Sequence, residues 1–433
     1  MKLTIENFAK IRQAKIDVDG ITVIAGENNT GKSTVGKVLY ALFNTTSNFE
    51  DRVLEQRFQE TGRICSTTLQ EFALHNSVSV RSGRIFMDQR KIQRHVREQI
   101  EKRGELSPLL LEDFCLQTLR TDFPQTDQTD EMVSTLTQKI AAVWDIPTER
   151  IRRRLITQQF NEIFSGQPSP LQDEETESVL TLVIKEKALT VRLRESACVD
   201  FQAEYGLTHQ ALLIANPFLV DSLGAGSYFP RGLYQPDRYL INRLTDAENE
   251  DWDSLLDSMI AEDKMEEINQ ILRQAVDGDI VSDQDNSYAL TESGLSAPVA
   301  LSNLSTGVKA FVMLKMLLER GVIREKDVVV FDEPEIHLHP QWQMTYAELI
   351  VLLQKYFDLS IVVTTHSPYF LDAINLYSIK HKISSKVNYY LSRLEQGRAE
   401  FEKVNGKLEL IYQKMATPAR ALDSLRLELS QEE

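Results

Sequence analysis

The pattern of hydrophobic and polar positions predicts strands and helices that alternate at both ends of the chain. Near the start, residues 3–8 and 14–18 alternate between apolar and polar, and residues 21–26 form an almost continuous apolar run. Such a run is typical of a strand whose two faces are both buried. Apolar residues then recur with helical spacing from Lys32 to about Leu42, which predicts a helix directly after the buried strand.

The same pattern returns after residue 300. We predict a helix near residues 306–320, a strand at 327–332, a helix near 341–356 and a strand at 360–365. Strands that alternate with helices are typical of a parallel sheet covered by helices on its faces. The sequence therefore predicts an α/β fold.

The residues between these two ends have a different character. Residues 47–170 are rich in Arg, Gln, Glu and Leu, which predicts a mainly helical insertion in the fold. Residues 177–194 predict an antiparallel hairpin, so the sheet should be mixed. The predicted segments are the first core strands (1–46), the helical insertion (47–170), further core strands with a helical lobe (171–300), the last core strands (301–375), and a hairpin with a closing helix (376–433).

Composition limits the partners and the compartment. The chain of 433 residues has 48 Lys and Arg against 64 Asp and Glu, and the net charge of −16 argues against a surface that binds DNA throughout. Three cysteines, Cys65, Cys115 and Cys198, lie far apart, which suits a reducing compartment. The chain starts with a strand pattern rather than a signal peptide, and no apolar run is long enough to span a membrane. We expect a cytoplasmic protein with no membrane partner.

Candidate chemistry first appears at the turn between the buried strand and the first helix. Residues 26–33, GENNTGKS, fit the Walker A pattern G-x-x-x-x-G-K-[ST]. Glycines in such a loop let backbone N–H groups surround a phosphate, and the helix N-terminus favours its negative charge. Lys32 would contact the β and γ phosphates of ATP, and the Ser33 hydroxyl would bind Mg²⁺. The predicted nucleotide-binding residues of this loop are Gly26, Asn28, Asn29, Thr30, Gly31, Lys32, Ser33 and Thr34.

Two consecutive carboxylates follow the strand predicted at 327–332. In VVVFDEPE, Asp332 ends the apolar run and Glu333 comes directly after it. A carboxylate at the end of a buried strand can hold Mg²⁺ through water, and the next carboxylate can act as general base for the attacking water. A solvated acidic turn has the same sequence, but the Walker A loop upstream favours a catalytic pair.

Two further motifs flank this strand in the sequence. Ser305 and Gly307 open a predicted helix in LSTGVK; such a helix start can bind an anion, although serine is also a common helix cap. His366 follows the strand at 360–365, and it would lie beside the γ-phosphate if that strand neighbours the strand ending at Asp332. We predict Ser305, Gly307 and Lys309 as nucleotide-binding residues, Ser33 and Asp332 as metal-binding residues, and Lys32, Glu333 and His366 as catalytic residues.

Other residues support more than one interpretation. His337 and His339 have a spacing that a metal site can use, but no third ligand has a clear spacing. Basic residues gather at 90–97 and 150–154, where they form either solvated helix faces or contacts with nucleic acid or a protein partner. The sequence leaves these alternatives open.

The ordered set GENNTGKS, LSTGVK, VVVFDEPEIHLHP and TTHSP resembles ABC-type ATPases of the branch that includes RecF, SMC and OLD proteins. The opening strand pair is similar to that branch, and the form of the loop after Asp332 resembles the OLD-related AAA ATPases. The resemblance covers the two ends of the chain. It implies a P-loop ABC-ATPase core that uses ATP and Mg²⁺, with Glu333 as general base and His366 as switch histidine.

The resemblance also implies that two copies pair head-to-tail around ATP. Ser305 and Gly307 would contact the γ-phosphate bound by the other copy, and the loop from Glu335 to His339 would cross the seam between the copies. The glutamine that touches Mg²⁺ in this superfamily would be Gln158, Gln159 or Gln202.

The departures from the family pattern narrow the expected function. The signature is LSTGVK rather than the LSGGQ of transporters, and residues 367–433 are too few for the Toprim nuclease of OLD proteins and contain no Asp-x-Asp. The chain is therefore similar to the ATPase subunits of two-component anti-phage systems such as Septu and PARIS. We expect a regulatory ATPase that controls a separate effector such as a nuclease, with nucleic acid or a phage protein as trigger. The alternatives are a DNA repair or maintenance ATPase that binds DNA directly, and a clamp that turns ATP over very slowly.

Overall fold

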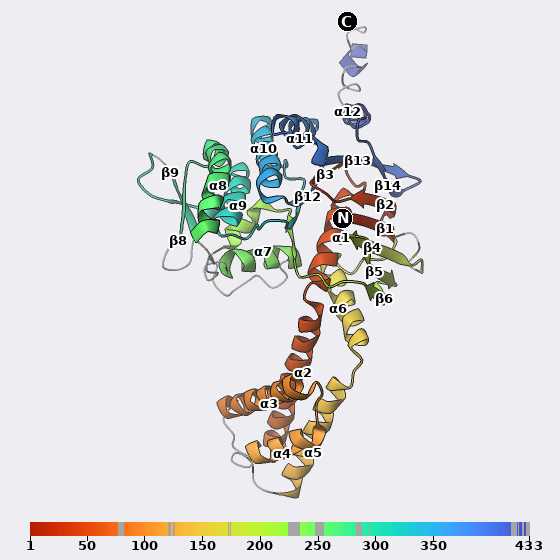
Figure 1. Ribbon diagram of the computed structural model, residues 1–433, viewed down its shortest axis with the longest axis vertical. Helices are drawn as coiled ribbons and strands as arrows, with labels where there is room; N and C mark the ends of the chain where they lie inside the picture. Colours follow the sequence, from red (N-terminus) through yellow and green to blue (C-terminus); the bar gives the residue numbers. More distant parts are fainter. Residues whose placement is uncertain are drawn as a thin grey trace. The chain divides into compact units, whose positions relative to one another are not determined.

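The computed structural model describes residues 1–76, 82–119, 123, 126–171, 173, 175–223, 234–246, 255–282, 288–292, 294–416, 422, 424–426, 428 and 429. They fall into two compact units, which we call the sheet unit (residues 1–47 and 156–433) and the helical unit (residues 48–155) (Figure 1). None of the helices within the described ranges is both long and apolar enough to cross a membrane.

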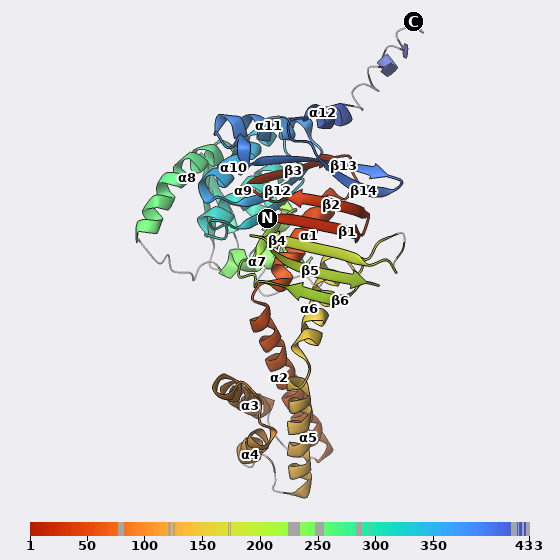
Figure 2. The ribbon, with the colours of Figure 1, turned by 45° about the vertical axis from the view of Figure 1, so that its right-hand side comes forward.

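Eleven of the described strands form one mixed sheet in the sheet unit (Figures 1 and 2). Their bounds are β1 Lys2–Phe8, β2 Ile11–Asp17, β3 Ile21–Gly26, β4 Ser178–Ile184, β5 Lys187–Arg194, β6 Ala197–Ala203, β7 Ala211–Ile214, β11 Val328–Asp332, β12 Ser360–Thr365, β13 Val387–Glu395 and β14 Arg398–Lys403. Their order is β6-β5-β4-β1-β2-β14-β13-β3-β12-β11-β7. The strands from β13 to β7 in this order run parallel, whereas those from β6 to β2 form antiparallel pairs.

The parallel strands are buried on both faces, as their apolar runs predict. On one face lies α1 (Lys32–Thr46), which follows the Walker A loop. A Cβ on Gly36 of this helix would lie 2.6 Å from Val330 Cγ1 of β11, so the absence of a side chain lets the helix approach the sheet closely. The Walker A loop is therefore anchored on both sides, by β3 before it and by a tightly packed helix after it.

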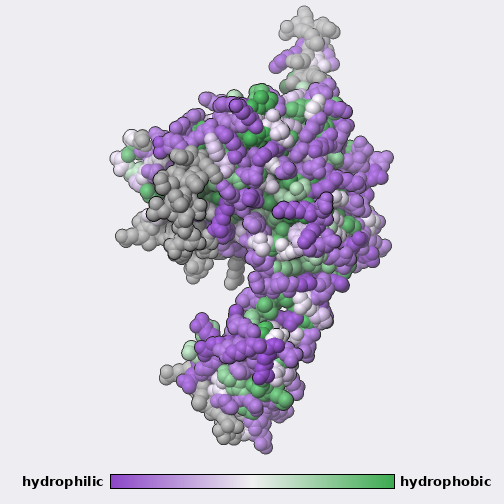
Figure 3. Space-filling model, in the orientation of Figure 1, coloured by the Kyte–Doolittle hydropathy of each residue, from purple (hydrophilic) through white to green (hydrophobic). Residues whose placement is uncertain are grey.

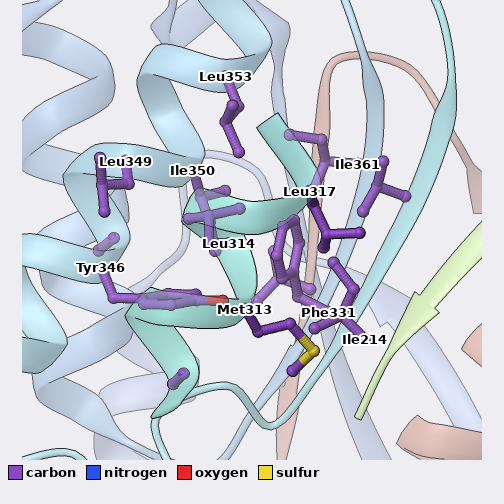
Figure 4. Close-up of a cluster of buried hydrophobic side chains, with 14 of the residues drawn as sticks. Ile214, Met313, Leu314, Leu317, Phe331, Tyr346, Leu349, Ile350, Leu353 and Ile361 are labelled. Carbon is purple, nitrogen blue, oxygen red and sulfur yellow. The ribbon is translucent and has the colours of Figure 1, made fainter. Parts of the chain in front are cut away.

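The opposite face is covered by α9 (Thr306–Glu319), α10 (Pro340–Phe357) and α11 (Pro368–Lys380). Figure 4 shows how Phe331 of β11 and Ile361 of β12 meet Leu317 of α9 and Tyr346 and Ile350 of α10. All five side chains are almost fully buried. Burial of one such side chain stabilises the fold by about 1.5–3 kcal/mol, so this layer fixes the parallel strands in their order.

The antiparallel part of the sheet has its own aromatic core. The ring of Phe8 at the end of β1 meets Phe160 of α6 (Thr148–Ile163) and Phe164 edge to face, with centroids 6.3 and 4.8 Å apart. Such pairs add about 0.5–1.5 kcal/mol beyond the burial of their area.

The remaining elements of the sheet unit complete its periphery. Helical segments are η1 Pro217–Ser222, α7 Gln235–Asp246, α8 Leu255–Ala275, η3 Leu301–Asn303, η4 Ser384–Lys386 and α12 Glu409–Met415. A second small sheet has the order β10-β9-β8, with bounds β8 Gly278–Ser282, β9 Tyr288–Glu292 and β10 Val299–Ala300. Most of the face of this unit that is visible in Figure 3 is hydrophilic, with smaller apolar areas between.

The helical unit is built from α2 (Phe49–His75), α3 (Ser82–Arg103), α4 (Pro108–Leu119), α5 (Asp127–Trp144) and the first part of α6. Its core includes Leu69, Ile92, Leu111 and Leu136, one from each of the first four helices. Cys65 and Cys115 are buried in the same core, where burial raises the pKa of both thiols. The thiols therefore act as small apolar side chains rather than as nucleophiles.

The predicted α/β class with a mixed sheet is confirmed, and the strands at 21–26 and 360–365 have the predicted bounds. The sequence pattern missed β6 and the small sheet, because both consist of short or largely exposed strands without a clear apolar alternation. The division into five segments stays a prediction.

Candidate functional site

The order of the parallel strands brings three of the predicted motifs to one edge of the sheet, which we call the catalytic edge. Strands β3, β12 and β11 are neighbours, and Asp332 pairs in register with Thr364 while Thr365 pairs with Ala25. Because the carboxyl ends of parallel strands meet at one edge, the segments after them lie side by side. The condition that the sequence set for His366, a strand next to the strand of Asp332, is met.

The Walker A loop leaves β3 at Gly26, where a side chain would collide with the hydroxyl of Ser392 on β13. Within the loop, Asn29 and Gly31 adopt left-handed backbone conformations with φ of 65° and 79°. Thr30 is buried, and its hydroxyl donates to the carbonyl of Glu27 at 2.7 Å. Asn28 and Asn29 are exposed, and Ser33 and Thr34 are half-buried in the first turn of α1. This curved backbone is the form of loop that surrounds a phosphate.

Lys32 points back into this loop. Its side chain is 3% exposed, and Nζ donates to the carbonyls of Gly26 and Glu27 at 3.0 and 2.8 Å. The same Nζ lies 3.4 Å from Oε1 of Glu333. The buried charge is therefore held between the loop carbonyls and one carboxylate of the next motif.

The two consecutive carboxylates are held by β12. Thr364 Oγ1 donates to Asp332 Oδ1 at 2.6 Å, and the backbone N–H of Glu333 donates to Thr364 O at 3.1 Å. Glu333 has φ of 49°, a left-handed conformation that is uncommon for a residue with a side chain. The hydrogen bonds to Thr364 stabilise this turn, which directs the carboxylate of Glu333 toward Lys32 on one side and His366 on the other.

His366 lies between two carboxylates. Its Nδ1 is 3.5 Å from Oε2 of Glu333 and 3.3 Å from Oε1 of Glu335. The side chain of His366 is 41% exposed, whereas that of Glu335 is 2% exposed. Burial raises the pKa of the Glu335 carboxyl, and hydrogen bonds from Thr365 and the backbone of His366 act in the opposite direction.

The position of Glu335 corrects the prediction that the loop from Glu335 to His339 crosses a seam between copies. A side chain this deeply buried in its own chain has no surface left for a second copy. Ile336 and His337 are exposed, so the outward part of this loop begins one residue later. His337 stacks edge to face on Phe218, with centroids 5.7 Å apart, and the His339 side chain accepts from the backbone N–H of Gln341 at the start of α10.

The start of α9 carries the other predicted nucleotide-binding residues, and their contacts are elsewhere. Ser305 is exposed and caps the helix, with its hydroxyl accepting from Val308 N. A Cβ on Gly307 would lie 2.8 Å from the ring of Trp342, so α10 packs directly on the helix start. Lys309 is buried, with Nζ 2.7 Å from Asp221 of η1 and 3.0 Å from Ser302 O. These contacts join the start of α9 to η1 and α10 rather than to the Walker A loop.

The glutamines proposed for Mg²⁺ lie elsewhere. Gln158 bonds to Glu162 within α6, which also carries Gln159, and Gln202 bonds to Asp200 on β6, at the opposite border of the sheet from β11. Besides β12, the neighbour of β11 in the sheet is β7, and Ile214 of β7 pairs with Phe331 of β11. Asn216 follows two residues past the end of β7, and its side chain caps η1, where Oδ1 accepts from the backbone N–H of Phe218 at 3.0 Å.

These residues fit a nucleotide with Mg²⁺. The curved loop presents backbone N–H groups and a buried lysine, and Ser33 and Asp332 offer the hydroxyl and carboxylate oxygens that Mg²⁺ prefers. Among the described residues, no group of three or more His, Cys, Asp or Glu side chains is placed to hold a metal alone. A Mg²⁺ site completed by phosphate oxygens needs no such group.

The fold and this edge define a P-loop nucleotide-binding domain of the ABC type. Residues 1–189 match a family model described as "AAA ATPase domain", and residues 198–372 match one described as "AAA domain, putative AbiEii toxin, Type IV TA system". The first match contains the Walker A loop and the second contains Ser305, Glu333 and His366. Both segments are thus similar to ATPase domains of AAA type, and the motifs are divided between the two matched segments.

The chain is also similar to solved structures of SMC heads. They are the SMC head domain from Thermotoga maritima (TM-score 0.38, covering 93% of this chain and 98% of that one), an SMC head bound to the C-terminal winged-helix domain of ScpA (0.42; 93% and 96%), and an SMC head with an extended coiled coil bound to the C-terminal domain of ScpA from Pyrococcus furiosus (0.41; 96% and 99%), each 11% identical. All three TM-scores lie below 0.5, so the similarity to ATPase domains rests on the two family models.

Proposed function

We propose that this chain binds and hydrolyses ATP with Mg²⁺, and that two copies pair head-to-tail around the nucleotide. The observation that carries the proposal is the single cluster of Lys32, Glu333 and His366 at the catalytic edge, joined by contacts of 3.4 and 3.5 Å. The start of α9, with Ser305 exposed, makes its contacts elsewhere in the same chain. One chain therefore presents two surfaces that only a second copy would bring together.

Each residue at the catalytic edge has a role in this proposal. The Walker A amides and Lys32 bind the phosphates, and Ser33 and Asp332 hold Mg²⁺, which when bound neutralises charge on the phosphate oxygens. Glu333 takes the proton of the attacking water.

Exposed apolar side chains near the catalytic edge support pairing. Ile336, Met344 and Tyr369 are 40%, 49% and 65% exposed. The helix starts that carry the last two are joined by the hydrogen bond from Ser367 Oγ to Gln343 Oε1, at 2.7 Å. Apolar residues beside charged catalytic groups are the composition that an interface buries.

The regulatory role is proposed for a two-component system that resists phage infection. Its support is the form of the motif set and the description of the matched segment 198–372, which names a toxin of a type IV toxin–antitoxin system, itself a two-component arrangement. ATP-dependent pairing of this cytoplasmic ATPase, resembling OLD-type subunits, would hold or release a separate effector. Phage protein or nucleic acid would act as the trigger.

Direct DNA binding has less support. In the helical unit, Lys91 lies 3.1 Å from Asp88, Arg97 is 3.9 Å from Glu55, and Arg152 pairs with Glu50. Carboxylate partners offset part of the positive charge that would neutralise DNA phosphates. The described contacts therefore favour solvated helix faces with paired charges over a DNA-binding surface.

The mass of the Glu333→Gln variant with and without Mg²⁺ and ATP tests the proposal. Removal of the general base should leave ATP bound but uncleaved, so light scattering should show a doubled mass only with ATP. Glu348→Gln, on the half-buried carboxylate that accepts from His381 at the end of α11, is the matched control and should behave as wild type. A Glu333→Gln protein that binds ATP and stays at its nucleotide-free mass would refute head-to-tail pairing.

A further inference from the structure

One buried carboxylate at the catalytic edge has no role in the proposed hydrolysis. The Oε1 atom of Glu335 accepts hydrogen bonds from Thr365 Oγ1 at 2.6 Å and from the backbone N–H of His366 at 2.9 Å. Its second oxygen, Oε2, is buried without a hydrogen-bond partner among the described residues. An ionisable side chain placed this way is costly to bury, so it requires a physical reason.

The imidazole of His366 supplies that reason. Its Nδ1 lies 3.3 Å from Oε1 of Glu335, on the buried side, and 3.5 Å from Oε2 of Glu333. Carboxylates beside one ring nitrogen favour the tautomer that carries hydrogen on that nitrogen. The other nitrogen, Nε2, makes no polar contact with the described residues, and it belongs to a side chain that is 41% exposed. Nδ1 therefore faces the two carboxylates, and Nε2 is the ring nitrogen without a polar partner among the described residues.

The anchor reaches beyond the carboxylate. The backbone N–H of Ser367 donates to Thr365 Oγ1 at 3.0 Å, and Ser367 Oγ donates to Gln343 Oε1 at 2.7 Å. Ser367 also caps α11. The end of β12, the start of α10 and the start of α11 are thus fixed around the backbone of His366.

We propose that Glu335 is a positioning residue for His366, which it holds with hydrogen on Nδ1 and with Nε2 toward the side where the γ-phosphate of ATP would lie. This inference rests on the proposed ATP hydrolysis at the catalytic edge. It assigns separate tasks to the two glutamates of the DEPE sequence. Glu333 acts on the water, and Glu335 acts only through the histidine.

A neutral side chain of the same shape separates this role from a purely structural one. In Glu335→Gln, the amide oxygen can still accept from Thr365 and from the backbone of His366, so the local fold should be retained. The carboxylate next to Nδ1 is lost. We expect kcat of ATP hydrolysis to fall about 10-fold or more, with KM and the affinity for a non-hydrolysable ATP analogue almost unchanged.

The effect should disappear when the histidine is absent. In a His366→Ala background, Glu335→Gln should cause no further loss of kcat, because the two residues act as one unit. Glu348→Gln, which neutralises a half-buried carboxylate beside another histidine, should leave kcat at the wild-type value. Thr365→Val removes one donor to Oε1 and keeps the charge, so it should cause a smaller fall than Glu335→Gln.

The state of the ring can be measured without turnover. The ¹⁵N chemical shifts of the His366 ring, assigned by comparison with His366→Ala, should show hydrogen on Nδ1 in the wild type and a shift toward the other tautomer in Glu335→Gln. The Glu348→Gln protein should give the wild-type signals.

Unchanged ring signals in Glu335→Gln overturn the inference, and so does a further fall of kcat in the His366→Ala background. A wild-type protein that hydrolyses no ATP overturns the proposed function instead. In that case, a change of the His366 tautomer in Glu335→Gln would still show that Glu335 positions the ring. The two failures are therefore distinguishable.

Discussion

The catalytic edge and the start of α9 both carry charged residues of the motif set, but they hold these residues in different ways. At the catalytic edge, the carboxylate of Glu333 lies 3.4 Å from Lys32 Nζ and 3.5 Å from His366 Nδ1. At the start of α9, Lys309 is neutralised by Asp221 of η1, and Ser305 remains exposed. The first region is assembled for chemistry inside one chain, whereas the second is internally satisfied and presents only its helix end to the outside.

The largest expected effect comes from the catalytic edge. Lys32→Ala removes the buried cation between the Walker A carbonyls and Glu333, which would stabilise charge on the transferring phosphate. We expect kcat/KM for ATP to fall on the order of 10³-fold in a phosphate-release assay. Lys315→Ala, which removes a lysine of similar burial on α9, should retain most of the activity. Equal losses of kcat/KM in the two variants would contradict a specific role of Lys32 in ATP hydrolysis.

A mixing experiment tests whether the two regions complete each other. Ser305→Arg places a bulky cation at the exposed helix end and should abolish ATPase activity by itself. In a symmetric pair, a mixture of Ser305→Arg and Lys32→Ala chains contains mixed pairs with one intact site, so activity should recover to about a quarter of the wild-type value or less. Ser384→Arg, on an exposed residue of η4, is the control and should be fully active. No recovery in the mixture would contradict completion by a second copy.

The start of α9 should respond in stability. Asp221→Asn leaves the 5% exposed side chain of Lys309 without its carboxylate, and because Asp221 is itself 32% exposed, the expected loss is only about 1–2 kcal/mol. The melting temperature should fall by about 2–6 °C, measured by calorimetry. Asp358→Asn, in an exposed pair with Lys386, should change it by less than about 1 °C. A melting temperature unchanged in Asp221→Asn would show that η1 does not hold the helix start.

The smallest effect concerns the pH dependence of stability. Burial raises the pKa of Glu335 above its ordinary value of 4.5. A carboxyl with a raised folded-state pKa contributes stability below its ordinary pKa and loses this contribution as the pH rises through the folded value. Glu335→Gln does not titrate, so its melting temperature relative to wild type should increase as the pH is raised from about 4.5 toward neutrality.

Thr365→Val sharpens this pH test. It removes a hydrogen bond that lowers the pKa of Glu335, so this variant should lose more stability than wild type over the same pH range. If the difference between Glu335→Gln and wild type is constant with pH, the carboxyl of Glu335 is not held in a raised-pKa state.

Much of the fold could be predicted from local patterns. The apolar runs gave β3 and β12 with their observed bounds, and helical spacing gave α9 and α10 to within a residue or so. These elements are buried on both faces or along a broad stripe, so their own sequences show the apolar pattern that predicts them. The strand β6 has mostly exposed or half-buried positions, and its sequence therefore shows no apolar pattern that would predict a strand.

The candidate site shows the same division. The Walker A loop could be recognised because glycine and lysine at fixed spacing determine its backbone and its charge. The burial of Glu335 could not be recognised, since it depends on which strand lies beside β11. The family resemblance placed Glu335 in a loop between two copies, whereas the structure buries its side chain next to the exposed residues Ile336 and His337.

The sequence by itself determined the buried strands and helices and the Walker A loop, because these depend on spacing within a few residues. Only the tertiary structure decided that β12 lies between β3 and β11, that the buried Glu335 contacts His366, and that Asp221 pairs with Lys309. Glu335 and His366 are 31 positions apart in the sequence, Asp221 and Lys309 are 88 apart, and the pairing of Ile21 with Ile361 joins β3 to β12 across 340 positions. Burial and packing of the whole sheet select them, and no local pattern encodes which distant partner will be chosen.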